Sequence, residues 1–105
     1  MRKGKALQKE LNRIKIPFGL TLSDLEYFLA KNGVVRYYDG LYYDRKTIWH
    51  SLFYEKEDQR FLVYVNKYIA FVKRRKLEHD LKAFKKKSKA YHQKRKIKKK
   101  ISFNN

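Results

Sequence analysis

Apolar residues recur at the spacing of an α-helix along most of this chain, and one tyrosine-rich stretch alternates instead. The first helical stripe lies within residues 5–15 and consists of Leu7, Leu11 and Ile14. Basic residues occupy the opposite face, so the pattern predicts a short amphipathic helix. Pro17 and Gly19 then interrupt the periodicity. Because a proline disfavours the helical conformation of the residue before it, we expect Ile16 to be extended.

Residues 21–32 carry the clearest helix signals. Four apolar residues at helical spacing form the predicted buried stripe: Leu22, Leu25, Phe28 and Leu29. Two pairs fit a capping box at the start equally well, Ser23 with Glu26 and Thr21 with Asp24. Gly33 is placed to end the helix, because glycine readily adopts the left-handed conformation that follows a helix terminus.

Residues 34–44 read VVRYYDGLYYD and alternate like a β-hairpin. The Asp39-Gly40 pair lies between two β-prone runs, which favours a two-residue type I′ turn. This register pairs Tyr38 with Leu41, Tyr37 with Tyr42 and Arg36 with Tyr43. Alternation then predicts two faces. One consists of Arg36, Tyr38, Leu41 and Tyr43, and the other of Val35, Tyr37, Tyr42 and Asp44.

Helical spacing returns in residues 45–54. The apolar positions are Ile48, Trp49, Leu52 and Phe53. Asp44 precedes them, and an aspartate is a favoured N-cap residue. We therefore expect a helix from Arg45 to Tyr54, with Trp49 in the core.

The chain from Arg60 onward supports two interpretations. Residues 61–65, FLVYV, are β-prone and by themselves indicate a strand over 60–65. A helical stripe nevertheless runs through Leu62, Val65, Ile69 and Val72, and acidic residues at 57 and 58 favour a helix N-terminus there. We favour one long helix from about Asp58 to the high eighties, buried in its first half and projecting as a basic arm in its second.

Together these elements predict an α+β fold, mostly helical, with a small helical core around one β-hairpin (34–44) and a long basic C-terminal helix. The expected organisation is a basic N-terminal helix (1–16), a compact core with the tyrosine-rich hairpin (17–72), and a basic helix with a polybasic tail (73–105). At 105 residues, the chain has the length of one small domain plus a tail.

Charge is distributed very unevenly along the chain. The formal net charge is +18, and residues 17–60 contribute −1 while residues 1–16 contribute +5 and residues 61–105 contribute +14. Fifteen of the 28 residues from Lys73 to Lys100 are Lys or Arg. Such a concentration of positive charge is costly unless water, counterions or an anionic partner neutralises it. Leu77, Leu81 and Phe84 lie on one helical face inside this stretch.

Several classes of function are disfavoured by composition. The chain contains no cysteine, so it has no disulfide, no thiolate zinc site and no Cys nucleophile. No glycine-rich phosphate loop or paired catalytic carboxylates are recognisable, and the three histidines, His50, His79 and His92, are scattered. We expect neither enzymatic activity nor a metal or cofactor. The N-terminus lacks a secretory signal and no run of about 18 apolar residues occurs, so we expect no integral membrane segment and a cytoplasmic, nucleoid or organelle-matrix location.

The expected function is non-enzymatic binding of nucleic acid, DNA or RNA, as a ribonucleoprotein component or a small DNA-binding accessory factor. The predicted phosphate contacts are Arg2, Lys3, Lys5, Arg13, Lys73, Arg74, Arg75, Lys76, Lys85, Lys86, Lys87, Lys94, Arg95 and Lys96. Stacking on unpaired bases is a further use for exposed tyrosines, and Arg36, Tyr37 and Tyr42 are the predicted base-facing set. The competing hypotheses are an adaptor whose basic helix occupies an acidic groove of a larger partner, anchored by Leu77, Leu81 and Phe84, and an assembly protein that neutralises RNA inside a particle.

Overall fold

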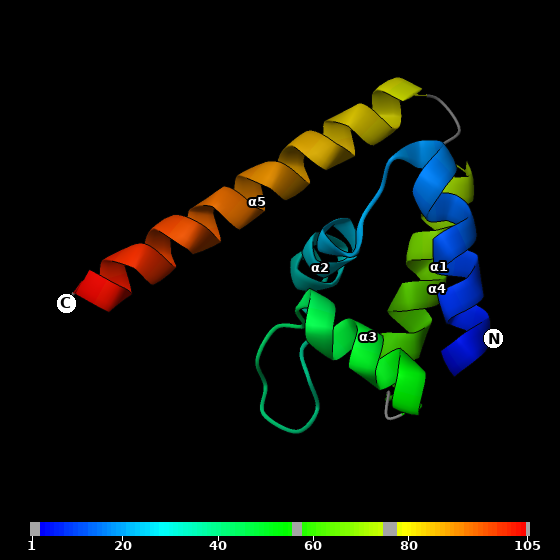
Figure 1. Cartoon of the computed structure of the whole chain (residues 1–105), viewed down its shortest axis with the longest axis horizontal. Coiled ribbons are helices and arrows are strands. Elements are labelled where there is room, and N and C mark those ends of the chain that lie inside the picture. The colour runs from blue at the N-terminus through cyan, green and yellow to red at the C-terminus, as the bar shows by residue number, and fades with distance from the viewer. Residues whose placement is uncertain (1–2, 56–57, 75–77, 105) are drawn as a thin grey trace.

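The computed structural model describes residues 3–55, 58–74 and 78–104, and these residues form five helices (Figure 1). In chain order they are α1 (Gly4–Phe18), α2 (Leu22–Lys31), α3 (Arg45–Tyr54), α4 (Gln59–Arg74) and α5 (Glu78–Asn104). No strand occurs in the described part of the chain, where residues 35 and 42 form an isolated bridge. The expected α+β class is therefore wrong, and the fold is all-α.

Residues 35–42, which we call the tyrosine loop, take the place of the expected hairpin. One antiparallel bridge joins Val35 to Tyr42. The backbone N–H of Arg36 donates to the carbonyl of Leu41 at 2.8 Å. The expected register paired Tyr42 with Tyr37, so it was wrong by two residues.

The turn itself explains this shift in register. A type I′ turn needs positive φ at both central residues, and of Asp39 and Gly40 only Gly40 has it, at 71°. The carboxylate of Asp39 accepts a hydrogen bond from the N–H of Leu41 (3.0 Å), and the N–H of Gly40 donates to the carbonyl of Arg36 (2.8 Å). These bonds close a four-residue turn over 37–40 in place of a two-residue turn.

The predicted alternation of faces is also wrong. Tyr43 is 1% exposed and packs on Phe61, with ring centroids 4.6 Å apart. Its expected face-mates Tyr38 and Leu41 are exposed. With one bridge and no sheet among the described residues, the loop has no buried face along its length, and the core residues Val34 and Tyr43 lie just outside its two ends.

Helices α2 and α3 begin and end close to the positions that their local signals predict. The box at the start of α2 uses Thr21, whose N–H donates to the carboxylate of Asp24 at 2.7 Å. Gly33 ends α2 with φ 69°, as predicted. The carboxylate of Asp44 caps α3 by accepting from the N–H of Thr47 at 2.7 Å. These predictions are confirmed.

Two predictions about α1 and α3 are wrong. Ile16 is helical, because α1 continues through Pro17 in its last turn and stops at Gly19, whose φ is 64°. Trp49 is 40% exposed and not a core residue. The inward stripe of α3 is formed by residues 48, 51 and 52, which leaves Trp49 and Phe53 on its flank.

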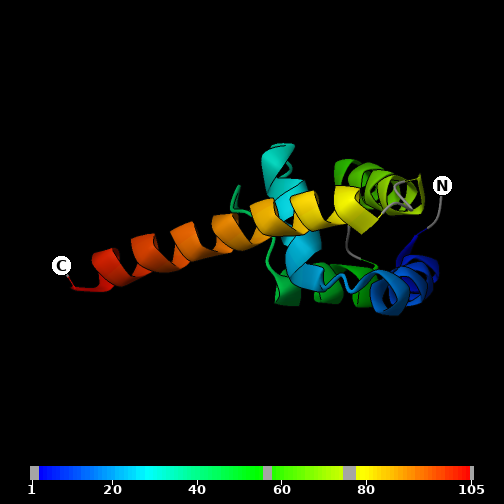
Figure 2. The ribbon, with the colours of Figure 1, turned by 90° about the horizontal axis from the view of Figure 1, so that it is seen from above.

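Residues 60–65 belong to α4, so the strand alternative is wrong. The single long helix is wrong as well, because α4 ends at Arg74 and α5 runs in a different direction (Figure 1). Residues 75–77 lie outside the described residues. Figure 2 shows α5 crossing α2, with its C-terminal part extending beyond the other helices. A straight continuation of α4 would have left the apolar residues of α5 in water.

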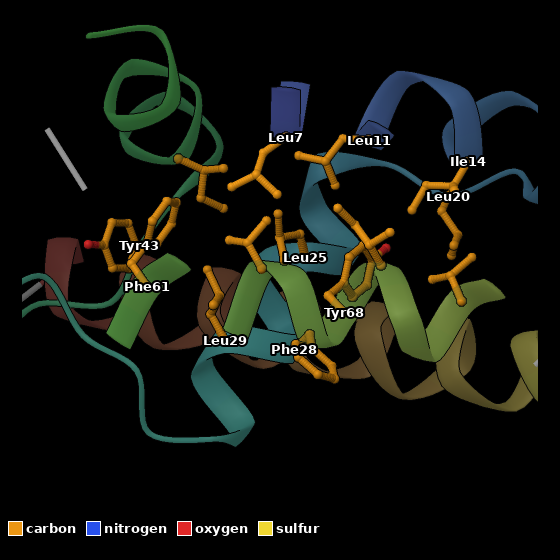
Figure 3. Packing of buried hydrophobic residues seen from close by; sticks show 14 of the residues in the cluster. Leu7, Leu11, Ile14, Leu20, Leu25, Phe28, Leu29, Tyr43, Phe61 and Tyr68 are labelled. Carbon is orange, nitrogen blue, oxygen red and sulfur yellow. The ribbon is translucent and has the colours of Figure 1, made fainter. Parts of the chain in front are cut away.

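The core contains residues from all three expected regions of the chain, 1–16, 17–72 and 73–105. In Figure 3, Leu7 and Leu11 of α1 point toward Leu25 of α2, and Tyr68 of α4 lies beside them. Residues 81 and 84 of α5 belong to the same cluster. Within the described residues, the buried hydroxyl groups of Tyr43 and Tyr68 have no hydrogen-bond partner, and burial raises the pKa of both phenols.

Candidate nucleic-acid interface

Helix α5 has two faces of different chemistry. The face that packs on α2 carries Leu81, Phe84 and Ser88, all buried. The opposite face is lined by exposed lysines, and we call this set the outer lysine face. It consists of Lys86, Lys87, Lys89 and Lys94. Within the described residues, none of these four lysines forms an ion pair.

The polar residues on the inner face of α5 are held by α2 and the turn before it. The ammonium of Lys85 lies 3.1 Å from the carboxylate of Asp24, and it also donates to the carbonyl of Gly19. Further along, His92 Nε2 lies 2.8 Å from the carbonyl of Ser23, and its Nδ1 lies 3.5 Å from the Glu26 carboxylate. The side chains of Lys85 and His92 therefore contact acceptors of the protein itself.

Most described carboxylates have internal roles of this kind. Glu10, which is buried, binds the ammonium of Lys73 at 2.8 Å and the guanidinium of Arg13 at 3.0 Å. Asp44 and Asp58 cap helices by accepting from backbone N–H groups. The acidic residues thus stabilise the fold, and within the described residues they form no ion pair with the outer lysine face.

The predicted phosphate contacts separate into three groups in the structure. Exposed side chains are Lys3, Lys5, Arg13, Lys73, Arg74, Lys86, Lys87 and Lys94, of which Arg13 and Lys73 bind Glu10. Lys85 is half-buried against Asp24. Arg2, Arg75 and Lys76 lie outside the described residues, and for Arg95 and Lys96 only the helical backbone of α5 is described. The structure does not gather the first group into one patch, because α1 packs on α3 and α4 while α5 packs on α2.

Sequence reasoning missed two exposed lysines that complete these surfaces. Lys9 shares an exposed face of α1 with Lys5 and Arg13, and Lys89 belongs to the outer lysine face. Helical spacing alone was enough to find Lys9, which lies four residues from each of its neighbours. Lys89 required knowing which side of α5 meets the protein.

The three residues predicted to face bases differ in their exposure to solvent. Tyr37 and Tyr42 are exposed. Arg36 is largely covered, because its guanidinium binds the carboxylate of Asp39 through two hydrogen bonds of 2.9 and 2.5 Å. These bonds raise the pKa of the Arg36 guanidinium and lower the pKa of the Asp39 carboxyl. Arg36 thus holds the loop together.

Two of the three anchors of the adaptor hypothesis are buried. Leu81 and Phe84 are 6% and 5% exposed and belong to the core cluster. Leu77 lies outside the described residues. A partner groove would have to displace these side chains from α2 before binding them, so this structure gives the adaptor hypothesis no support.

A pocket of about 240 Å³ lies between α1, the turn before α2 and Trp49. Its lining is mainly apolar, with Leu11, Leu25 and Tyr68 among the walls, and the lining residues that the structure describes include no Lys or Arg. In the described part of the chain, no three His, Cys, Asp or Glu side chains are grouped so as to hold a metal ion. Nor is any helix there long and apolar enough to cross a membrane.

Comparison with known proteins provides no further guide, because no family model, curated protein or solved structure matches this chain.

Proposed function

We propose that this protein binds nucleic acid without catalysing a reaction on it, and that the outer lysine face of α5 lies along the phosphate backbone. The observation that carries the proposal is the division of α5 into two faces. On its inner face Lys85 is paired with Asp24 and His92 lies beside Glu26, both residues of α2, while the outer lysine face has no ion pair within the described residues. Each lysine that neutralises a phosphate releases condensed counterions, which favours binding.

Helix α1 supplies a second basic surface in this proposal, through Lys5, Lys9 and Arg13. The chain has 20 Lys and 8 Arg. A lysine acts on phosphate as a point charge, whereas arginine provides the bidentate contacts that distinguish bases. The composition therefore favours contact with the backbone of DNA or RNA over the recognition of a base sequence, in a ribonucleoprotein or on DNA in the cytoplasm, nucleoid or organelle matrix.

Salt dependence tests this proposal directly. Fluorescence anisotropy would measure the affinity of the full chain for a labelled duplex and a labelled single strand over a range of salt concentrations. On the duplex, each phosphate contact adds about 0.9 to the slope of log affinity against log salt. The test variant replaces the four residues of the outer lysine face by Gln and should reduce that slope by about 3 to 4.

A matched variant controls for the loss of net charge. It replaces four exposed cations on other helices by Gln: Lys31, Lys46, Arg60 and Lys67. Its slope should stay within about one of the wild-type value. If the two variants lowered the salt slope equally, the interaction would be general charge attraction and not binding by the outer lysine face. The absence of salt-dependent binding would refute the proposal. Deletion from residue 73 onward is unsuitable, because it removes Leu81 and Phe84 from the core.

A further inference from the structure

The tyrosine loop presents an unusual concentration of exposed apolar surface. The side chains of Tyr37, Tyr38, Leu41 and Tyr42 are 61%, 57%, 59% and 49% exposed. The next residue along the chain, Tyr43, is buried in the core. Figure 1 shows the loop between α2 and α3 extending away from the helices. Exposing four large side chains within six residues costs solvation free energy, so the loop requires an explanation beyond folding.

The loop is nevertheless held in a defined shape. Two hydrogen bonds join the guanidinium of Arg36 to the carboxylate of Asp39, and that carboxylate also accepts from the N–H of Leu41. Gly40, with φ 71°, closes the turn by donating to the carbonyl of Arg36. A loop ordered before binding loses less conformational entropy when a ligand arrives. The exposed tyrosines are therefore presented on a fixed frame.

The geometry of the rings selects among possible ligands. The rings of Tyr37 and Tyr38 are perpendicular, at 89°, with centroids 5.3 Å apart. The guanidinium of Arg36 lies 5.4 Å from the centroid of Tyr38. Two perpendicular rings suit flat ligand groups that can each stack on one ring without being held parallel to one another. The bases of an intact duplex are parallel and paired, and they present only their edges in the grooves. Unpaired bases, by contrast, stack readily on aromatic side chains.

We propose that Tyr37 and Tyr38 stack on unpaired nucleobases, with Arg36 and Asp39 acting as positioning residues for the loop. This rests on the proposed function, since it gives the phosphate-binding surface a ligand class, namely single-stranded or looped nucleic acid. The net charge of +18 favours a polyanionic ligand over a protein partner. The one carboxylate of the loop is neutralised by Arg36, so it offers little repulsion to a phosphate.

The test compares an oligothymidylate with a duplex of equal length. The combined variant Tyr37→Leu and Tyr38→Leu keeps apolar side chains but removes both rings. Its affinity for the single strand should fall by about tenfold or more. Its affinity for the duplex should change by less than about twofold, with the salt slope unchanged. The matched control, Trp49→Leu with Phe53→Leu, removes two exposed aromatic rings from α3 and should affect neither ligand.

Two further variants examine the mechanism. Replacing Tyr37 and Tyr38 by Phe keeps the rings and should retain single-strand affinity. Asp39→Ala removes one negative charge, so simple attraction predicts tighter binding, whereas loss of the ordered frame predicts binding to the single strand weaker by roughly twofold or more. Tighter binding by this variant would refute the positioning role.

The outcomes separate this inference from the proposed function. If the Leu variant bound the single strand as tightly as the wild type, the inference would be overturned. This would hold even if the tyrosines proved to bind a protein partner instead. An equal loss on both ligands would overturn it too. In either case the outer lysine face retains its own test through the salt slope. Circular dichroism of each variant would confirm that the helices are intact.

Discussion

Replacing Phe84 by alanine should reveal whether α5 is a structural element of the core. The ring of Phe84 lies close to four aromatic rings, with centroid separations of 5.2 Å to Phe71, 5.4 Å to Tyr27, 6.2 Å to Tyr68 and 6.5 Å to Phe28. Removing a buried phenylalanine side chain costs about 3–5 kcal/mol, as lost transfer free energy plus the cavity left behind. This is a large part of the stability of a small domain, which is about 5–15 kcal/mol.

Urea denaturation followed by circular dichroism measures this loss. In thermal denaturation, the same change should lower Tm by at least about 12 °C, since 1 kcal/mol corresponds to about 4 °C or more for a chain of this size. Phe84→Leu provides a milder variant in case the alanine variant is unfolded. Lys86→Ala, on the outer lysine face, serves as the control and should change the stability by less than about 0.5 kcal/mol.

Equal stability of Phe84→Ala and Lys86→Ala would refute the packing of α5 on α2. The distinction between an inner and an outer face of α5 would then fail, and with it the choice of lysines in the proposed interface. A large difference would show that the basic C-terminal segment belongs to the folded domain.

Two more predictions concern charged pairs. Lys85→Met should lower the free energy of unfolding by about 1–3 kcal/mol in urea denaturation, because it deprives the buried carboxylate of Asp24 of its ammonium partner; no difference from Lys86→Met would contradict this. In the Arg36–Asp39 pair, the pKa of the Asp39 carboxyl is lowered in the folded state. The stabilisation by this pair is therefore complete above the unfolded-state pKa of about 3.9. It is lost as the pH falls through the lower folded-state pKa. Carboxyl NMR titration should show the midpoint of Asp39 rising toward the ordinary value in Arg36→Gln, and an unchanged midpoint would count against the pair.

The helices α2 and α3 could be predicted from the sequence because the signals that define them are local. A capping residue, an apolar stripe and a terminating glycine act within a few positions of one another, and each formed as expected around Thr21, Gly33 and Asp44. The tyrosine loop could not be predicted in this way. Its residues have strong β propensity, but a strand is stabilised by neighbouring strands in a sheet. The described residues contain no strand that could pair with this loop.

The candidate interface was only partly predictable for a related reason. Composition identified the basic C-terminal segment, but the 15 basic residues between Lys73 and Lys100 are alike in sequence. Contacts with distant residues distinguish them. Lys73 binds Glu10, 63 positions away, and Lys85 binds Asp24, 61 positions away. No local pattern indicates such pairings.

The sequence by itself thus determined where helices begin and end around α2 and α3, the excess of positive charge, and the absence of cysteine chemistry. Only the tertiary structure decided that α5 turns back onto α2, that Tyr43 is buried while Tyr37 and Tyr38 are exposed, and which lysines face solvent. The reason is physical. Capping and helical periodicity depend on neighbours within one or two turns, whereas burial and ion pairing depend on which distant surfaces remove apolar groups from water.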